Sequence, residues 1–344
     1  MSHTEGGAPK AVLFGCAGES LSAAEARFFA AARPLGFILF ARNCRTPEQV
    51  RGLVVALRDS VGRADAPVLI DQEGGRVARL RPPHWRLPPA GSAFAALHAR
   101  APDKALAAAR ANARLIAADL HDLGIDIDCW PVLDLPTVGA DPVIGDRALA
   151  GTVAAIAALG QAICEGLLAG GVLPMVKHTP GHGRAAVDSH LALPVVEATL
   201  AELAQSDFAP FRALRDASFA MTAHVVYTAI DPRAPASLSP RVIAEVIRGE
   251  IGFTGALVSD DIGMAALSGS LAERAQAVLE AGCDLALHCS GDLEDMTAIA
   301  AAVPPLGGAA QARVAQALIR RRPAESFDRS AAASLVQAEL GSER

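Results

Sequence analysis

The sequence has little of what a nucleic-acid-binding surface requires. Its 344 residues include 31 lysines and arginines against 37 aspartates and glutamates, which gives a formal net charge of −6, and aromatic residues make up only 4%. A protein that binds nucleic acid is expected to present a basic face. The composition therefore argues against a nucleic-acid partner. The hydrophobic fraction of 51% is enough for one large core, so a chain of this length can form a single domain.

Closely spaced cysteine pairs are also missing. The six cysteines are scattered, with no C-x-x-C motif: Cys16, Cys44, Cys129, Cys164, Cys283 and Cys289. This pattern predicts reduced thiols and a cytoplasmic location. The apolar run before Cys16 loosely resembles a lipoprotein cleavage site, but it is far shorter than the apolar core of a signal peptide and lacks a basic segment before it. We expect a buried first strand there.

No uninterrupted apolar run is long enough to predict a membrane span. From Ala148 to Val176 the only charged residue is Glu165, yet five glycines, Gln161 and Pro174 interrupt the segment. Its hydrophobicity comes mostly from alanine, whereas a spanning helix needs about 20 predominantly apolar residues. The segment predicts a buried helix followed by a buried strand, and no membrane partner is expected.

What the sequence does contain is a regular series of short apolar runs. Eight runs of strand length occur at residues 11–15, 36–40, 67–70, 125–132, 173–177, 219–224, 256–260 and 284–288. Helix-start signals lie between them, including the capping-box pairs Ser22/Glu25 and Ser270/Glu273. The alternation predicts an α/β protein, a (β/α)8 TIM-type barrel spanning residues 1–344 as one domain, with about ten disordered residues at the N-terminus. A doubly wound open sheet is the alternative, but no G-x-G-x-x-G turn follows the first run.

Polar residues gather where the predicted strands end, which is where a barrel of this type builds its active site. They are Asp71, Gln72, Glu73, Arg76, Arg79, Asp134, Asp146, Arg147, Lys177, His178, His224, Asp260, Asp261 and His288. Glu73 and Arg76 are more simply interpreted as solvated loop charges, and Asp134 and His288 as strand caps. Strand alternation predicts that Asp260 and Asp261 point to opposite sides, so that only one faces a substrate.

The stretch VKHTPGHGRAAVDSH (176–190) is the densest cluster of such residues. Pro180, Gly181 and Gly183 predict a loop after the fifth strand. His178 and His182 are four residues apart, but that spacing places two metal ligands on one face only in a helix, so we expect no metal and no cofactor. Asp188 and His190 are two residues apart, which suits a carboxylate that orients a general acid and base.

Taken in order, the motifs DQEGGRVARL, IGDR, KHTPGHG…DSH, AHVVY and LVSDDIGM resemble glycoside hydrolase family 3, over nearly the whole chain. The resemblance implies a catalytic nucleophile at Asp260 and an acid–base pair at His190 and Asp188. It also implies sugar-binding roles at five positions: Asp71, Arg79, Arg147, Lys177 and His178. The sequence departs from the family pattern at Thr179 and at residues 184–186, which puts loop packing and the preference for the leaving group in question.

The resemblance also implies a function. It is a retaining β-N-acetylglucosaminidase that removes terminal N-acetylglucosamine from muropeptides containing 1,6-anhydro-N-acetylmuramic acid during cell-wall recycling, through a covalent glycosyl-aspartate. The expected partner is this small-molecule substrate, and the expected assembly is a monomer. Two alternatives stay open: a phosphorylase, because a histidine acid carries no negative charge to repel phosphate, and an inactive sugar-binding barrel.

Overall fold

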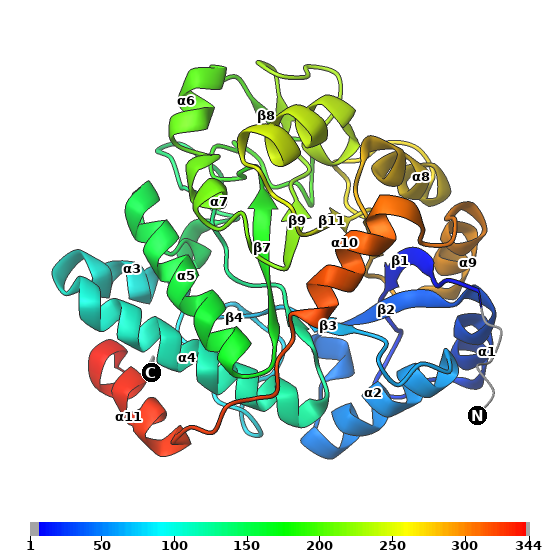
Figure 1. Cartoon of the computed structure of the whole chain (residues 1–344), viewed down its shortest axis with the longest axis horizontal. Coiled ribbons are helices and arrows are strands. Elements are labelled where there is room, and N and C mark those ends of the chain that lie inside the picture. Colours follow the sequence, from blue (N-terminus) through cyan, green and yellow to red (C-terminus); the bar gives the residue numbers. More distant parts are fainter. Residues whose placement is uncertain (1–6, 342–344) are drawn as a thin grey trace.

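A closed barrel of eight parallel strands forms the centre of the protein (Figure 1). The computed structural model describes residues 7–341. The barrel strands, in their order around the barrel, are β1 (Lys10–Phe14), β12 (Leu285–His288), β11 (Ala256–Asp261), β9 (Phe219–Thr222), β7 (Leu173–Thr179), β6 (Ile127–Asp128), β3 (Val68–Ile70) and β2 (Pro34–Leu39). The sheet closes because β1 pairs with both β2 and β12. The predicted barrel is confirmed and the doubly wound alternative is wrong.

Helices surround the barrel (Figure 1). They are α1 (Ala23–Ala32), α2 (Pro47–Ser60), α3 (Gly91–Arg100), α4 (Pro102–Leu123), α5 (Val153–Ala169), α6 (Leu200–Gln205), α7 (Ala209–Ala213), α8 (Leu271–Ala281), α9 (Leu293–Ala302), α10 (Gly308–Ile319) and α11 (Arg329–Leu340), with a π-helix, η4 (Val242–Glu250). The predicted capping boxes at Ser22 and Ser270 are confirmed. The apolar segment from Ala148 to Val176 contains α5 followed by β7. This is the buried helix and buried strand that were predicted there in place of a membrane span.

The strands form because their residues are apolar on both faces, as covered parallel strands require. Leu13, Ile38, Leu69, Val176 and Leu257 are all at most 1% exposed. Such aliphatic side chains fill a barrel interior and leave polar residues to the strand ends. The polar residues of the barrel therefore lie at its two rims.

Several short elements lie beyond the C-terminal rim. Two-stranded sheets are formed by β4 (Gln72–Gly74) with β5 (Val77–Ala78) and by β8 (Val195–Val196) with β10 (Val226–Tyr227), and three 3-10 turns are η1 (Ala41–Asn43), η2 (Gly145–Arg147) and η3 (Ala236–Leu238). The residues between β7 and β8 form the predicted loop without a helix. Of these elements, β4, β5 and η2 contribute residues to the wall of the cavity at the barrel mouth.

At the opposite rim, Asp284 shows how the N-terminal end is closed. It precedes β12, and its Oδ2 accepts the backbone N–H of Leu257 at 2.9 Å. Arg248 and Arg313 donate to the same carboxylate at 3.0 and 2.6 Å. The carboxylate thus links β11 and the start of β12 to η4 and α10, so its charge stabilises the fold.

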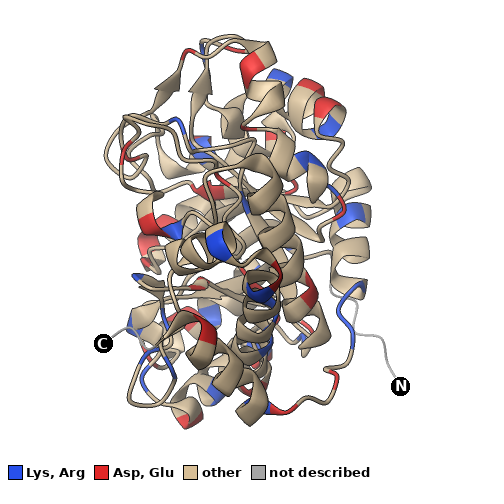
Figure 2. Cartoon of the chain, turned by 90° about the vertical axis from the view of Figure 1, so that its left-hand side faces the viewer, with Lys and Arg blue, Asp and Glu red and all other residues tan. Residues whose placement is uncertain are grey.

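The predicted disorder of about ten N-terminal residues falls outside the described residues for residues 1–6, and β1 already begins at Lys10. Within residues 7–341 no helix is both long enough and apolar enough to cross a membrane. All six cysteines are free thiols, as predicted. Figure 2 shows basic and acidic residues interspersed over the side of the described chain that faces the viewer.

Candidate active site

All eight predicted site residues line one cavity of about 460 Å³. They come from different parts of the chain: Asp71 and Arg79 follow β3, Arg147 is in η2, Lys177 and His178 are in β7, Asp188 and His190 are in the loop after β7, and Asp260 is in β11. These positions are at or beyond the C-terminal ends of the strands, where barrels of this type carry out their chemistry. The fold therefore brings together residues up to 189 positions apart in the sequence.

A chain of alternating charges crosses the floor of this cavity. Lys177 Nζ lies 2.7 Å from Asp71 Oδ1 and 2.7 Å from Glu73 Oε1. Arg79 donates to Asp71 Oδ2 at 2.9 Å, and Arg147 binds both oxygens of Glu73 at 2.8 and 2.9 Å. Three cations thus share two carboxylates, which leaves an excess of donors that can face hydroxyl or amide oxygens of a ligand.

The charges in this chain stabilise one another. Burial alone raises the pKa of a carboxyl, but the positive charges of Lys177 and Arg79 outweigh it and hold the pKa of Asp71 well below its usual range. Likewise, burial is outweighed at Glu73, where Arg147 and Lys177 lower the pKa to about 2. Burial would lower the pKa of Lys177, yet the two carboxylates raise it. All three groups are therefore ionised at neutral pH.

The interpretation of Glu73 as a solvated loop charge is wrong. Its side chain is 3% exposed and forms the bidentate pair with Arg147. The chain turns sharply at Gly74, where φ is +114° and a Cβ atom would lie 2.2 Å from the Pro89 carbonyl oxygen. Only glycine fits such a turn, and the turn directs Glu73 inward. Arg76 does behave as a loop charge, because its side chain is 47% exposed and pairs with Asp146.

His178 is oriented by a residue that the sequence suggested only as a strand cap. Asp134 Oδ2 lies 2.7 Å from His178 Nδ1, and Asp134 Oδ1 accepts the backbone N–H of His182 at 2.6 Å. The buried carboxylate of Asp134 therefore fixes the ring of His178, with Nε2 3.5 Å from Arg147 Nη2. Burial, with His178 next in effect, lowers the pKa of His182 to about 4, so this second ring is neutral.

The two aspartates at the end of β11 both border the cavity, and the opposite directions expected for their side chains stay a prediction. The pairing of β11 with β12 shifts register between Val258 and Asp261, which interrupts the simple alternation. Their surroundings nevertheless differ. Asp261 Oδ1 accepts two backbone N–H groups, from Gly263 at 2.9 Å and Cys289 at 3.2 Å. Among the described residues, Asp260 Oδ1 accepts only the N–H of Asp261, at 2.8 Å, so Asp260 is the freer carboxylate.

The predicted Asp188–His190 pair is formed. Asp188 Oδ1 lies 2.7 Å from His190 Nδ1 and also accepts the backbone N–H of His190 at 2.9 Å. Partial burial raises the pKa of Asp188, but these hydrogen bonds from His190 outweigh it and lower the pKa below its usual value. Because Nδ1 is engaged, Nε2 of His190 is the nitrogen that can exchange a proton with a ligand.

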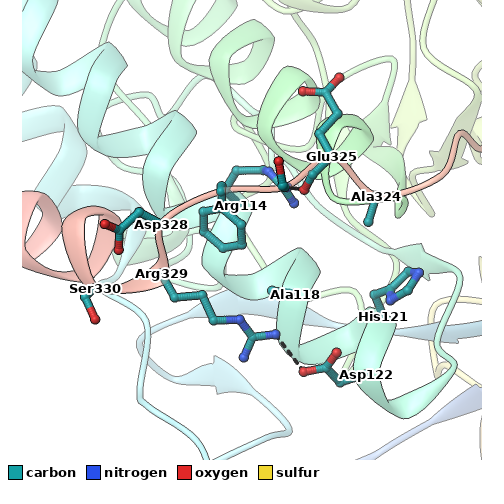
Figure 3. A pocket seen from close by; sticks show the side chains of 11 residues that line it. Arg114, Ala118, His121, Asp122, Ala324, Glu325, Asp328, Arg329 and Ser330 are labelled. Carbon is teal, nitrogen blue, oxygen red and sulfur yellow. Dashed lines mark hydrogen bonds and ion pairs between the residues drawn. The ribbon is translucent and has the colours of Figure 1, made fainter.

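A second pocket, of about 480 Å³, contains none of these eight residues (Figure 3). It lies between α4 and the segment that leads into α11. Its arginines already have partners: Arg329 binds Asp122 at 2.6 Å, and Arg114 donates to the Glu325 carbonyl and stacks over the ring of Phe327 at 4.2 Å from its centroid. Within residues 7–341, no group of three or more potential ligands is arranged to hold a metal ion.

Sequence reasoning missed Glu73 and Asp134 as parts of the site. A signal for Glu73 was present in the two glycines that follow it, since they make a turn that returns the chain to the barrel mouth. A signal for Asp134 was its place after an apolar run, where a carboxylate must find hydrogen-bond donors. Its actual partner could not be seen because His178 is 44 residues away.

A free carboxylate, a histidine backed by an aspartate and an array of donors share one cavity at the mouth of a (β/α)8 barrel. This arrangement can attack a sugar carbon, protonate a leaving oxygen and hold hydroxyl groups, which is the work of a glycoside hydrolase. The model of the glycosyl hydrolase family 3 N-terminal domain matches residues 21–321. The chain belongs to glycosyl hydrolase family 3.

Relatives and solved structures agree with this family. A β-hexosaminidase from Alkalilimnicola ehrlichii is 42% identical over 283 residues, covering 81% of this chain and 80% of that protein. NagZ from Neisseria gonorrhoeae in complex with N-trifluoroacetyl-D-glucosamine superposes with a TM-score of 0.88 at 32% identity, covering 97% of this chain and 99% of that one. A family 3 β-N-acetylglucosaminidase from Paenibacillus superposes with a TM-score of 0.85 at 31% identity; the match covers 96% of this chain and 66% of that longer protein.

Proposed function

We propose that the protein is a retaining β-N-acetylglucosaminidase that acts through a covalent glycosyl-aspartate. The observation that carries the proposal is the joint placement of Asp260 and of the Asp188–His190 pair around one cavity floored by the charged chain. The names of the relatives, β-hexosaminidase and β-N-acetylglucosaminidase, support the same activity.

In the first step, a carboxylate oxygen of Asp260 attacks the anomeric carbon of the bound sugar. The bond between that carbon and the glycosidic oxygen breaks, and His190 Nε2–H donates its proton to the departing oxygen. The negative charge of Asp188 stabilises the imidazolium before the transfer. The products are a glycosyl ester on Asp260, a free alcohol and a neutral imidazole.

In the second step, the neutral His190 removes a proton from a water molecule, whose oxygen attacks the same carbon. The ester bond to Asp260 breaks and the sugar leaves with its original configuration, because two displacements have occurred. One group thus acts first as an acid and then as a base, which is general acid–base work that histidine often performs in enzymes.

The charged floor binds the sugar in this scheme. Arg79, Lys177 and Arg147 present donors to the hydroxyl and acetamido oxygens, while Asp71 accepts from a hydroxyl. Their mutual ion pairs fix their positions before the sugar arrives, so that binding is converted into orientation at the anomeric carbon. His178, held by Asp134, completes this wall.

The substrate we propose is N-acetylglucosamine β-linked to 1,6-anhydro-N-acetylmuramic acid, with or without its peptide, released in the recycling of cell-wall fragments in the cytoplasm. Support comes from the family resemblance and from the NagZ neighbours. A phosphorylase on the same scaffold predicts a sugar phosphate as product. Analysis of the products with and without phosphate in the buffer separates the two reactions, and the absence of any product would indicate a sugar-binding barrel.

The decisive test of the mechanism is covalent trapping. A 2-acetamido sugar fluorinated at C5 and carrying a good leaving group should label the enzyme, and peptide mapping should place the label on Asp260. Asp260→Ala should abolish labelling, whereas Asp261→Ala leaves it possible. Either of two results would show the proposed mechanism to be wrong. A label on Asp261 would make that residue the nucleophile, and no label together with strong inhibition by a thiazoline mimic of an oxazoline would make the substrate's acetamide the nucleophile.

A further inference from the structure

The loop after β7 has two parts with opposite surroundings. Residues 180–185 are buried apart from the partly exposed Arg184, whereas most of residues 186–193 are exposed, including His190, whose side chain is 63% exposed. The exposed part, which carries His190, therefore projects from the buried part, residues 180–185, which we call the base of the loop. Its position in the cavity depends on how firmly that base is held.

The backbone of the base is held closely by its neighbours. The hydroxyl of the fully buried Tyr227 donates to the Gly181 carbonyl. Gly183 lies so close to Leu135 that a Cβ atom on it would be 1.9 Å from the Leu135 carbonyl oxygen. These contacts leave little room for the backbone at either glycine to move.

Arg184 adds an ion pair to this base. Its Nε donates to Asp207 Oδ2 at 2.7 Å, and its Nη2 donates to Ser206 Oγ at 3.1 Å. The side chain of Asp207, between α6 and α7, is 1% exposed. Among the residues that the structure describes, no other basic side chain comes within ion-pair distance of Asp207. A buried carboxylate that lost this partner would be strongly destabilised, so the pair resists separation.

A short path connects this ion pair to His190. Arg184 is two residues from His182, whose Nε2 lies 3.0 Å from Ser189 Oγ. Ser189 is buried, immediately precedes His190, and its carbonyl accepts the N–H of Ala266 at 3.2 Å. A shift of Arg184 would move the ring of His182 and, through Ser189, the backbone at His190.

We propose that Arg184 is a positioning residue for His190: its ion pair with Asp207 fixes the base of the loop and so holds the acid–base histidine where it reaches the leaving oxygen. This role rests on the proposed function, which makes His190 the acid.

The test compares substrates whose leaving groups differ in their need for protonation. The variants are Arg184→Gln/Asp207→Asn, which removes the ion pair without leaving a buried charge unpaired, and Arg184→Lys, which keeps the charge. With an alkyl β-N-acetylglucosaminide the double variant should lose kcat/KM by about tenfold, and with the 2,4-dinitrophenyl substrate by less than about twofold, because kcat/KM reports the first step, in which His190 acts as the acid. KM for the alkyl substrate should stay unchanged, and Arg184→Lys, which keeps the charge, should keep most of the wild-type kcat/KM.

Arg212→Gln is the matched control. Arg212 lies on α7, close in sequence to Asp207, but pairs with Glu250 away from the loop. The Arg212→Gln variant should have the wild-type kcat/KM with both substrates. Equal losses on both substrates in the double variant, or a lower melting temperature with unchanged kcat per active site, would overturn the positioning role. If His190→Ala itself shows no leaving-group dependence, the proposed acid is wrong; if it does and the double variant does not, only the role of Arg184 is wrong.

Discussion

At the N-terminal rim of the barrel, buried carboxylates are fully occupied by protein groups. Asp126, which precedes β6, accepts the N–H of Val68 at 2.9 Å and binds Arg58 at 2.7 Å and Arg321. Asp284 repeats this arrangement before β12. At the C-terminal rim, Asp260 accepts a single backbone N–H and borders a cavity. The same residue type is thus closed off at one rim and left available at the other.

The difference follows from the partners that each rim supplies. A carboxylate that accepts hydrogen bonds from two arginines and a backbone N–H is a weak nucleophile, because its lone pairs are engaged. A carboxylate with one backbone bond keeps lone pairs for an incoming carbon. Burial and charge alone therefore do not identify the reactive acid in this protein; the number of donors around it does.

The largest effect is expected when the available carboxylate is removed. Asp260→Asn should lower kcat/KM for an aryl β-N-acetylglucosaminide by about 10⁴-fold or more, the scale seen when a catalytic nucleophile is lost. The melting temperature should hardly change, because Asp260 bonds to little else. Steady-state kinetics and calorimetry on the same preparation measure both. A variant that keeps more than about a tenth of wild-type activity would exclude Asp260 as nucleophile.

The next effect concerns the acid on the same rim. His190→Ala should slow substrates with poor leaving groups by about 10²- to 10⁴-fold, and activated aryl substrates much less, because protonation matters most for a basic leaving oxygen. Asp188→Asn should show a milder form of this dependence, since the ring remains but loses its charged partner. The measurement is a plot of log kcat/KM against leaving-group pKa. A slope unchanged from wild type would remove His190 from the acid role.

At the closed rim the expected effect is on stability instead. Asp284→Ala leaves Arg248 and Arg313 without their carboxylate and should cost about 3 kcal/mol of unfolding free energy, the low end for breaking a buried pair because both arginines are partly exposed. The kcat of the folded fraction should match wild type. Urea unfolding and active-site titration give the two quantities. A loss of kcat without loss of stability would mean that the two rims do not divide their roles in this way.

The sequence predicted the barrel well because local information determines it. Apolar runs, capping residues and turn residues are all readable in short windows, and the eight strands fall where these signals place them. Strand limits were less accurate: the run 125–132 contains a strand of only two residues, because polar contacts at Asp126 and Asp128 take over its ends.

The site was predictable as a set of residues but not as a set of contacts. The strand-end rule and the family resemblance gathered eight residues that do share a cavity. They could not show that Glu73 is buried against Arg147, that Asp134 orients His178, or that Asp261 as well as Asp260 borders the cavity. These facts depend on tertiary distances between residues far apart in the chain.

Over a single pH unit, the smallest effect is expected from a carboxyl that lies between the two rims. Asp128 in β6 is fully buried, and burial, against a hydrogen bond from the Gln72 N–H, raises its pKa to about 8. Between about pH 4 and 8 the folded protein keeps this proton while the unfolded chain releases it, so the unfolding free energy falls as pH rises, by at most about 1.4 kcal/mol per pH unit. Asp128→Asn has no such proton and should lose this decline.

The measurement is the difference in unfolding free energy between wild type and variant from pH 4.5 to 7.5, which cancels the titration of the other groups. The unfolding free energy of the wild type should fall steadily relative to that of the variant over that range. A constant difference would show that Asp128 is ionised within the barrel, paired with the charged floor above it rather than kept neutral by burial.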